Sequence, residues 1–267
     1  MSGTQAPASA RTLARPSRST RSRPAARGRY GVAGYALLAV GLFFAVNWAY
    51  HVVRKPTELL APVSPVLAKT PRSTWAAYGH LFREHSTEVV SAEFLAALAQ
   101  VEGKGNPIAR TYWRWQWALN PFEIYRPASS AVGMFQITDG TFREARRYCI
   151  HDHAVARDGP WYEPASCWFN SLYSRVVPSD AIELTAAYLD QAVRDTLARH
   201  RTARARLEQK QALAAVIHLC GVKRGDAFVR RGFHATPDER CGDHGLRHYL
   251  GQVSLLKRQF ARLEAVE

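Results

Sequence analysis

The stretch Ser91-Ala-Glu-Phe-Leu-Ala-Ala-Leu-Ala-Gln-Val-Glu102, followed by Gly103-Lys-Gly-Asn-Pro107, decides how this chain folds. Ser91 can cap a helix, apolar residues recur every three to four positions, and the glycines and proline end the pattern. Phe94 and Leu98 precede Glu102 by eight and four residues, so all three share one face of the helix. The stretch therefore predicts a helix that ends on a carboxylate within an apolar face.

Glu102 is the candidate catalytic residue because its predicted position is costly for a carboxylate. Removing a carboxylate from water without a partner is unfavourable, so such a residue usually has a use. The unpaired carbonyls at the end of a helix also disfavour negative charge. Both effects favour the protonated carboxyl that a general acid needs. The alternative is a helix-end glutamate that reaches solvent past Gly103.

Outward from this helix, the sequence predicts one mainly helical globular domain over residues 73–267. Further helical patterns cover about 179–200, 206–220 and 244–264. Residues 149–178 contain three prolines and one glycine and are expected to be irregular. At most a small sheet is expected, near Val132 to Thr138.

The N-terminal part predicts a membrane anchor. Residues 30–53 contain no Asp, Glu, Lys or Arg and are long enough to cross a bilayer as a helix. A cleaved signal peptide is the alternative, but the apolar run is longer than a typical signal core. Residues 54–72 carry four prolines and are expected to form a stalk between membrane and domain.

The charges around the apolar run predict its orientation. Residues 1–29 hold seven arginines and no acidic residue, and their remaining content predicts a disordered tail. Since positive charge favours the cytoplasmic side, the N-terminus is expected in the cytoplasm and the large domain outside. A basic tail could bind nucleic acid, but the apolar run beside it favours a role in topology and contact with anionic lipid.

Four cysteines, all in the exported part, predict disulfides rather than a metal site. Cys149–Cys167 and Cys220–Cys241 are the preferred pairs because both close short loops. Zinc is the competitor, with His151 and His153 near Cys149, but no pair of metal-ligand motifs frames a site. We expect neither a metal nor another cofactor.

Several motifs occur in an order that resembles the soluble lytic transglycosylase family, whose fold is that of goose-type lysozyme. Glu102 to Pro107 resembles the family's E-S-x-x-N-P motif, and Gly133 to Ile137 resembles its G-x-x-G-L-M-Q-I loop. Residues 213–221 lie where the family has A-A-Y-N-A-G, and Arg247 to Val253 resembles its late T-x-x-Y-V segment. The resemblance covers about residues 73–260. It implies a lysozyme-like α+β fold and cleavage of peptidoglycan glycan strands.

The chain departs from the family pattern in three places. Gly103 replaces the serine after the catalytic glutamate, and His218 and Leu219 replace a tyrosine and an asparagine. The interval from Glu102 to Gly133 is about ten residues longer than in simpler members, because of an insert rich in Trp and Tyr. These changes leave the catalyst in place but alter the residues expected around it.

The resemblance also implies the roles of the site residues. Glu102 would protonate the bond between N-acetylmuramic acid and N-acetylglucosamine, then deprotonate the muramyl 6-hydroxyl to form a 1,6-anhydro end. The expected substrate-binding residues are Gln136, Met134, Tyr249, His218 and Trp115. A hydrolase would need a second carboxylate. Candidates by presence alone are Glu123, Asp139, Glu144 and Asp226, and none lies on a clear apolar face.

Individual site residues have simpler alternatives. Gln136 could be a satisfied turn residue, and Tyr249 a core residue on the apolar stripe of the last helix. Trp113, Trp115 and Trp117 would share one side of an extended segment, as a sugar platform or as a wedge packed on the core or near the membrane.

The function expected from these observations is that of a peptidoglycan lytic transglycosylase in the inner membrane, with its domain in the periplasm. The expected partners are glycan strands, the membrane and an envelope or secretion assembly. The alternatives are a hydrolytic muramidase and a non-catalytic peptidoglycan-binding component of an envelope machine.

Overall fold

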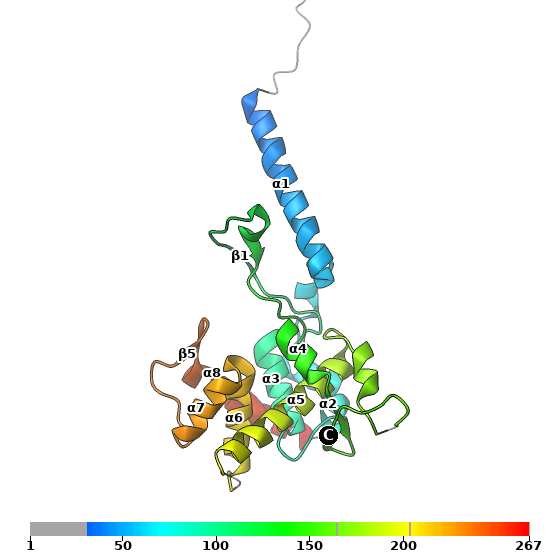
Figure 1. Ribbon diagram of the computed structural model, residues 1–267, viewed down its shortest axis with the longest axis vertical. Helices are drawn as coiled ribbons and strands as arrows, with labels where there is room; N and C mark the ends of the chain where they lie inside the picture. Colours follow the sequence, from blue (N-terminus) through cyan, green and yellow to red (C-terminus); the bar gives the residue numbers. More distant parts are fainter. Residues whose placement is uncertain (1–30, 164, 203, 267) are drawn as a thin grey trace, which may run out of the picture. The chain divides into compact units, whose positions relative to one another are not determined.

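The computed structural model describes residues 31–163, 165–202 and 204–266. This part of the chain is mainly helical and carries small antiparallel sheets, which confirms the predicted fold class (Figure 1). The basic tail over residues 1–29 lies outside the described residues, so its disorder stays a prediction.

Helix α1, Val32–Arg54, is long and apolar enough to cross a membrane. The chain divides into two compact units after Ala45, and the first part of α1 belongs to the N-terminal unit. Its large apolar side chains, such as Val32, Tyr35 and Leu37, are exposed. A helix of this composition needs an apolar environment around it.

The proline-rich segment 54–72 packs against the domain instead of forming a free stalk. Glu58 is fully buried and pairs with Arg110. The backbone N–H of Lys69 donates to the carbonyl of Lys104 at 2.8 Å. The segment expected as a stalk therefore has polar groups that find partners on the domain, and its role between membrane and domain stays a prediction. The segment contains two short 3-10 helices, η1 Pro56–Leu60 and η2 Ser64–Leu67.

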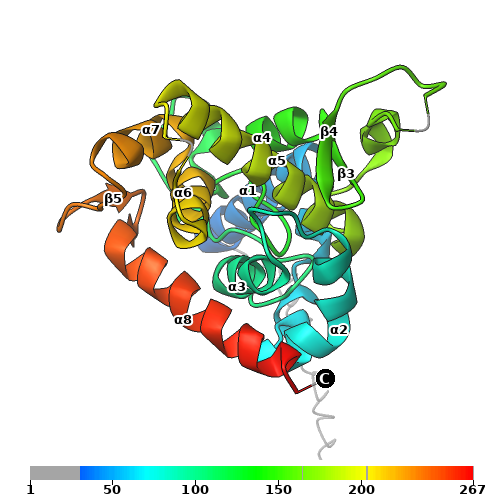
Figure 2. The same cartoon turned by 90° about the horizontal axis from the view of Figure 1, so that it is seen from below.

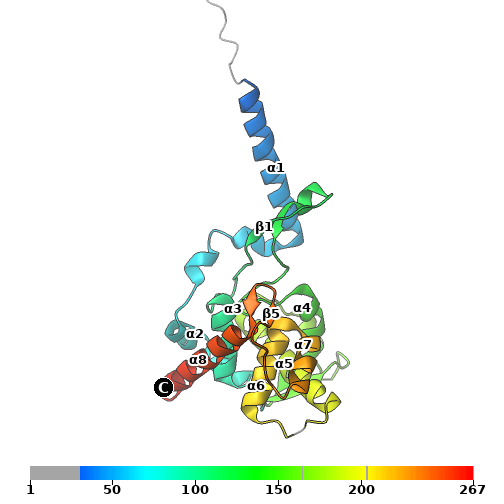
Figure 3. The same ribbon diagram turned by 90° about the vertical axis from the view of Figure 1, so that its left-hand side faces the viewer.

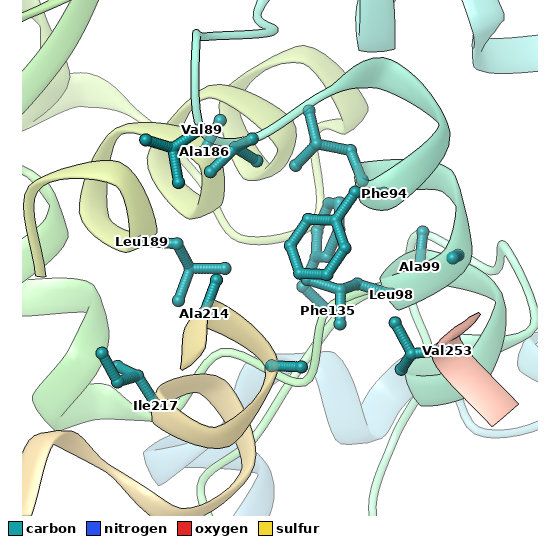
Figure 4. Close-up of a cluster of buried hydrophobic side chains, with 14 of the residues drawn as sticks. Val89, Phe94, Leu98, Ala99, Phe135, Ala186, Leu189, Ala214, Ile217 and Val253 are labelled. Carbon is teal, nitrogen blue, oxygen red and sulfur yellow. The ribbon is translucent and has the colours of Figure 1, made fainter. Parts of the chain in front are cut away.

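The domain is built around one central helix. Its helices are α2 Pro71–Glu84, α3 Ala92–Gly103, α4 Asp139–Ala145, α5 Pro178–Arg199, α6 Leu207–Cys220, α7 Val222–Arg230 and α8 Leu246–Glu264. Figure 2 shows α3 enclosed by α2, α5, α6 and α8. Residues 94–99 of α3 are all buried, and their alanines let neighbouring helices approach closely. Phe94 and Leu98 pack into the core with Phe135 and Val253 (Figure 4).

The start of α3 differs from the prediction in one detail. Ser91 occupies the position before the helix, but its side chain makes no capping hydrogen bond. Its hydroxyl instead accepts a hydrogen bond from Gln211 on α6 at 3.2 Å. A tertiary contact has replaced the local one.

The sheets lie elsewhere than expected. Residues 132–138 form only isolated bridges, between Arg110 and Val132 and between Val132 and Ile137. The sheets are three antiparallel pairs in the described residues: β1 Trp113–Trp115 with β2 Tyr125–Pro127, β3 Tyr148–His151 with β4 Ala154–Arg157, and β5 Arg240–Cys241 with β6 His244–Gly245.

The β3–β4 hairpin falls within the segment that was expected to be irregular. Its turn residues Asp152 and His153 have φ of 48° and 62°, the geometry of a tight hairpin turn. That turn usually carries glycine, and the Asp-His pair lacks this signal.

Both predicted disulfides are present, Cys149–Cys167 and Cys220–Cys241. Because all four sulfurs are used in these bonds, the zinc alternative at Cys149 does not hold. The second disulfide ties the end of α6 to β5, just before α8 begins.

Candidate active site

Glu102 lies in the last turn of α3, with its side chain 16% exposed. The chain reverses directly after it, since Lys104 and Gly105 have φ of 52° and 62°. The N–H of Gly105 returns to the carbonyl of Ala99 at 3.0 Å and closes the helix end. A Cβ on Gly105 would lie 2.2 Å from Oγ1 of Thr74, so glycine is required there. This turn holds Glu102 at the edge of the core.

Tyr249 is the direct partner of Glu102. Its hydroxyl donates a hydrogen bond of 2.6 Å to Oε1 of Glu102, and its side chain is buried. Burial above all, and then the charge and hydrogen bond of Glu102, raise the pKa of Tyr249 well above its usual range. Tyr249 therefore stays a protonated donor throughout the physiological range. Tyr249 thus combines packing in the core with a direct contact to the catalytic candidate.

His218 faces the same carboxylate from α6. Its Nε2 lies 3.6 Å from Oε1 of Glu102, and its side chain is 11% exposed. This separation is long for a direct hydrogen bond but short enough for strong electrostatic interaction when the imidazole is protonated. His218 is two residues from Cys220, whose disulfide to Cys241 fixes this end of α6.

Gly103 brings the Met-Phe-Gln-Ile loop against the end of α3. A Cβ at this position would lie 2.7 Å from Cα of Met134 and 2.8 Å from its carbonyl oxygen. Side chains do not tolerate such distances, so the serine of the family pattern would not fit this packing. Met134 itself is fully buried. Its side chain fills the core, and its contact with substrate stays a prediction.

Gln136 holds the shape of the same loop. Its φ is 48°, and its side-chain amide donates to the carbonyls of Ala109 at 3.2 Å and Gly133 at 2.9 Å. Both amide donors are thus used within the protein, as in the turn-residue alternative. Gln136 nevertheless lines a cavity of about 220 Å³ together with His218 and Tyr188. The cavity lies beside the Glu102 cluster, and Glu102 is not among its lining residues.

Tyr188 is a cavity residue that the sequence did not single out. Burial, followed by the charges of Glu144 and Tyr148, raises the pKa of Tyr188 to about 12. Its hydroxyl therefore stays neutral at physiological pH. On α5 it follows the general helical pattern, which carries no separate signal for a binding role.

Asn106 of the first motif has a structural role. Its side chain donates to the backbone carbonyl of Ser64 at 2.6 Å and accepts from the N–H of Ile108 at 3.0 Å. It is buried and joins segment 54–72 to the turn after Glu102. Nothing in the local pattern around Ser64 indicates this contact.

Trp115 lies in the β1–β2 hairpin, away from Glu102. Its ring packs on Tyr125 at 4.6 Å between centroids, and the side chain is 62% exposed. The hairpin contacts the C-terminal part of α1, beside which β1 lies in Figure 3. The structure therefore does not bring Trp115 together with Tyr249 and His218.

Three of the four other carboxylates considered as partners of Glu102 are paired with arginine. Asp139 contacts Arg175 at 2.8 Å, Glu123 contacts Arg126 at 2.6 Å, and Asp226 contacts Arg199 at 3.1 Å. The fourth, Glu144, is exposed on α4. Among the described residues, Tyr249 and His218 contact the Glu102 carboxylate through a hydrogen bond and an ion-pair distance, and no second carboxylate does so.

The site thus consists of one carboxylate with a permanent hydrogen-bond donor and an imidazole beside it. Such a group can exchange a proton with a substrate through its second oxygen while Tyr249 holds the first. Comparison with known protein families, with curated proteins and with solved structures found no match.

Proposed function

We propose that this chain is a membrane-anchored lytic transglycosylase that cleaves the bond between N-acetylmuramic acid and N-acetylglucosamine in peptidoglycan. The observation that carries the proposal is the hydrogen bond from Tyr249 to Glu102 at the end of a buried helix. The resemblance of the motifs described above supports it, because Glu102, Tyr249 and the loop around Gln136 lie near one another as that resemblance implies.

In the proposed reaction, Glu102 first donates its proton to the glycosidic oxygen as the C1–O4 bond breaks. The resulting carboxylate then takes the proton of the muramyl 6-hydroxyl, whose oxygen forms the new C1–O6 bond. Tyr249 holds Oε1 of Glu102 through both steps, which leaves Oε2 for the substrate. The proton returns to Glu102, and no water is consumed.

A single carboxylate is sufficient for this route, since the attacking group belongs to the substrate. A hydrolytic muramidase of the inverting type would need a second carboxylate to activate water. The pairing of Asp139, Glu123 and Asp226 with arginines argues against their use in that role. This arrangement favours the non-hydrolytic reaction over the muramidase alternative.

We place the enzyme in the cytoplasmic membrane, with α1 as a single span, the N-terminus in the cytoplasm and the domain in the periplasm. Support comes from the length and composition of α1 and from the seven arginines that precede it. The two disulfides suit an oxidising compartment. Anchoring would restrict cleavage to glycan strands that run near the membrane.

The test is mass spectrometry of purified cell wall digested by the full-length protein in detergent. Muropeptides with 1,6-anhydromuramyl ends are expected from the wild type and should disappear with Glu102→Gln. Glu144→Gln, at an exposed glutamate, is the matched control and should retain activity. Reducing muramic ends alone would establish a muramidase. Binding without any cleavage would favour the non-catalytic role in an envelope machine.

A further inference from the structure

The insert between Glu102 and the Met-Phe-Gln-Ile loop forms a feature that the catalytic proposal does not use. We name residues 113–127, comprising β1, η3 Pro121–Glu123 and β2, the aromatic hairpin. It packs against the last two turns of α1, where the ring of Tyr50 stacks on that of Phe122 at 4.7 Å. The ring of His51 meets that of Trp113 edge-on at 5.2 Å.

The aromatic hairpin also covers the polar groups of α1. The side chain of Asn47 donates to the carbonyl of Tyr125 at 2.7 Å, and Nε2 of His51 lies 2.8 Å from the carbonyl of Phe122. Asn47 and His51 are both buried by these contacts. A polar side chain near the end of a membrane span needs such a partner, because lipid offers none. The contacts of the hairpin therefore lie at the same depth in the proposed membrane span as Asn47 and His51.

That depth follows from the geometry of the helix. At a rise of about 1.5 Å per residue, Asn47 lies about 10 Å from the charged end of α1 at Arg54, measured along the helix axis toward its apolar part. His51 lies about 5 Å from the same end. Structures that rest in the interfacial layer of a membrane bury their apolar face to about 5–10 Å. The contacts of the aromatic hairpin thus fall within this layer.

The outer end of the aromatic hairpin is apolar and exposed. Trp117 and Leu119 are 104% and 107% exposed, and Trp115 is 62% exposed. Large apolar side chains that share one exposed region mark a contact surface, and tryptophan is the residue most typical of membrane interfaces. Exposure of these apolar side chains to water is unfavourable, and their burial in lipid would be favourable.

The charges beside this surface suit phospholipid headgroups. Arg54 and Arg126 flank Glu123 at 3.8 Å and 2.6 Å, which leaves a net positive charge on the three side chains. Arg114 on β1 adds another exposed cation. Basic groups at the membrane surface are attracted to lipid phosphates. Arg126 also donates to Oε1 of Gln116 at 3.3 Å, so its charge lies directly beside Trp117, as suits the boundary between headgroups and acyl chains.

We propose that the aromatic hairpin is a second membrane anchor, whose tip at Trp117 and Leu119 inserts into the leaflet facing the domain. It rests on the proposed span by α1. With α1 alone the domain could tilt relative to the membrane plane, whereas two attachments fix which side of the domain faces the membrane. The hairpin continues through residues 128–131 into the loop that packs on Gly103, so this orientation reaches the active site.

The test uses the full-length protein in phospholipid nanodiscs whose lipids carry bromine either near the headgroup or near the chain end. Bromine quenches tryptophan fluorescence on contact. Trp117→Ser should lose part of the quenchable signal, and the loss should be larger with bromine near the headgroup. Leu119→Trp should instead gain quenchable signal. Since both side chains are fully exposed, neither change should affect folding.

Trp161→Ser is the matched control, because Trp161 is 70% exposed on the domain outside the aromatic hairpin. Replacement of Trp161 should leave the quenching of Trp117 fluorescence by brominated lipid unchanged. Unchanged quenching in both Trp117→Ser and Leu119→Trp, with the protein still resistant to alkaline extraction from membranes, would overturn the second anchor and leave the α1 span standing. Extraction of the wild type by alkali would instead overturn the span. Lytic activity in detergent tests the catalytic proposal independently of both.

Discussion

Tyr249 on α8 donates a hydrogen bond of 2.6 Å to Glu102 at the end of α3, across 147 residues of sequence. Both helices belong to the core, and Val253, one turn after Tyr249, packs in the same apolar cluster as Phe94 and Leu98. The hydrogen bond is therefore positioned by helix packing rather than by a flexible loop. A carboxylate held in this way keeps one oxygen fixed and presents the other.

Tyr249→Phe should lower lytic activity while leaving the fold intact. The change removes one oxygen atom and the hydrogen bond to Glu102, and a hydrogen bond to a charged group contributes about 1.5–3 kcal/mol. We expect kcat/KM to fall by about ten- to a hundredfold, measured as release of soluble muropeptides.

Tyr173→Phe provides the control for Tyr249→Phe. The hydroxyl of Tyr173 donates to Oε2 of Glu183 at 2.7 Å, which makes it the same kind of contact away from Glu102. Its loss should lower the melting temperature with little effect on activity. Equal losses of activity in the two variants would show that Tyr249 acts only through stability.

Gly103→Ala should destabilise the protein and disturb the site. The added Cβ would lie 2.7 Å from Cα of Met134, so either α3 or the loop must shift. Overpacking of this kind costs about 1–3 kcal/mol in the free energy of unfolding. Urea unfolding followed by circular dichroism measures the change.

Gly251→Ala on α8 is the counterpart of Gly103→Ala. A Cβ there meets no atom within 4 Å. Alanine should therefore stabilise the helix by about 0.5–1 kcal/mol. If Gly103→Ala proved as stable as Gly251→Ala, the close contact between α3 and the loop would be disproved.

Asp226 should make stability depend on pH in acid. Burial alone would raise its pKa, but hydrogen bonds from His200 and Arg199 outweigh burial and lower the pKa of Asp226. A lowered pKa in the folded state contributes stability above the unfolded value of about 4, and this contribution is lost as pH falls through the folded value.

Asp226→Asn should therefore cost about 1 kcal/mol at neutral pH and progressively less as pH falls below about 4. Thermal melts of wild type and variant between neutral pH and pH 3 measure this convergence. A constant difference between the two at all pH values would contradict the assignment of the effect to the ionised carboxylate.

The parts of the structure that the sequence predicts are those with a periodic or short-range signal. The helical spacing of Phe94, Leu98 and Glu102 and the short loops between cysteines are of this kind, and the corresponding helix and disulfides are present. Isolated contacts between distant backbone and side-chain groups leave no such signal. The hydrogen bond from Asn106 to Ser64 is one, and it turns an expected stalk into a packed segment.

The site shows the same division. Tyr249 lies on an apolar stripe that the sequence shows clearly. Packing of this face of α8 against α3 brings its hydroxyl to Glu102. The local sequence around Met134 and Gln136 does not indicate whether their side chains face the substrate or the core. Only the close packing against Gly103 and the carbonyls around the loop decide that Met134 is buried and that Gln136 holds a turn.

The two disulfides should differ in their importance for activity. They close loops of similar length, with sequence separations of 18 and 21 residues, so loss of either should cost about 3 kcal/mol in stability. Only Cys220–Cys241 adjoins the site: it follows His218 on α6 and precedes Tyr249 on α8. Replacing both of these cysteines with serine should release the end of α6 and increase the separation between His218 and Glu102.

Activity of the two double-serine variants, measured well below both melting temperatures, separates stability from positioning. With Cys149 and Cys167 replaced, the folded protein should keep most of its activity, because that bond joins β3 to the segment before η4, Trp168–Leu172. With Cys220 and Cys241 replaced, activity should fall several-fold even in fully folded protein, since a displacement of about 1 Å at a catalytic group can cost a hundredfold in rate. Equal activity of the two folded variants would mean that core packing around α6 and α8 suffices to position His218 and Tyr249.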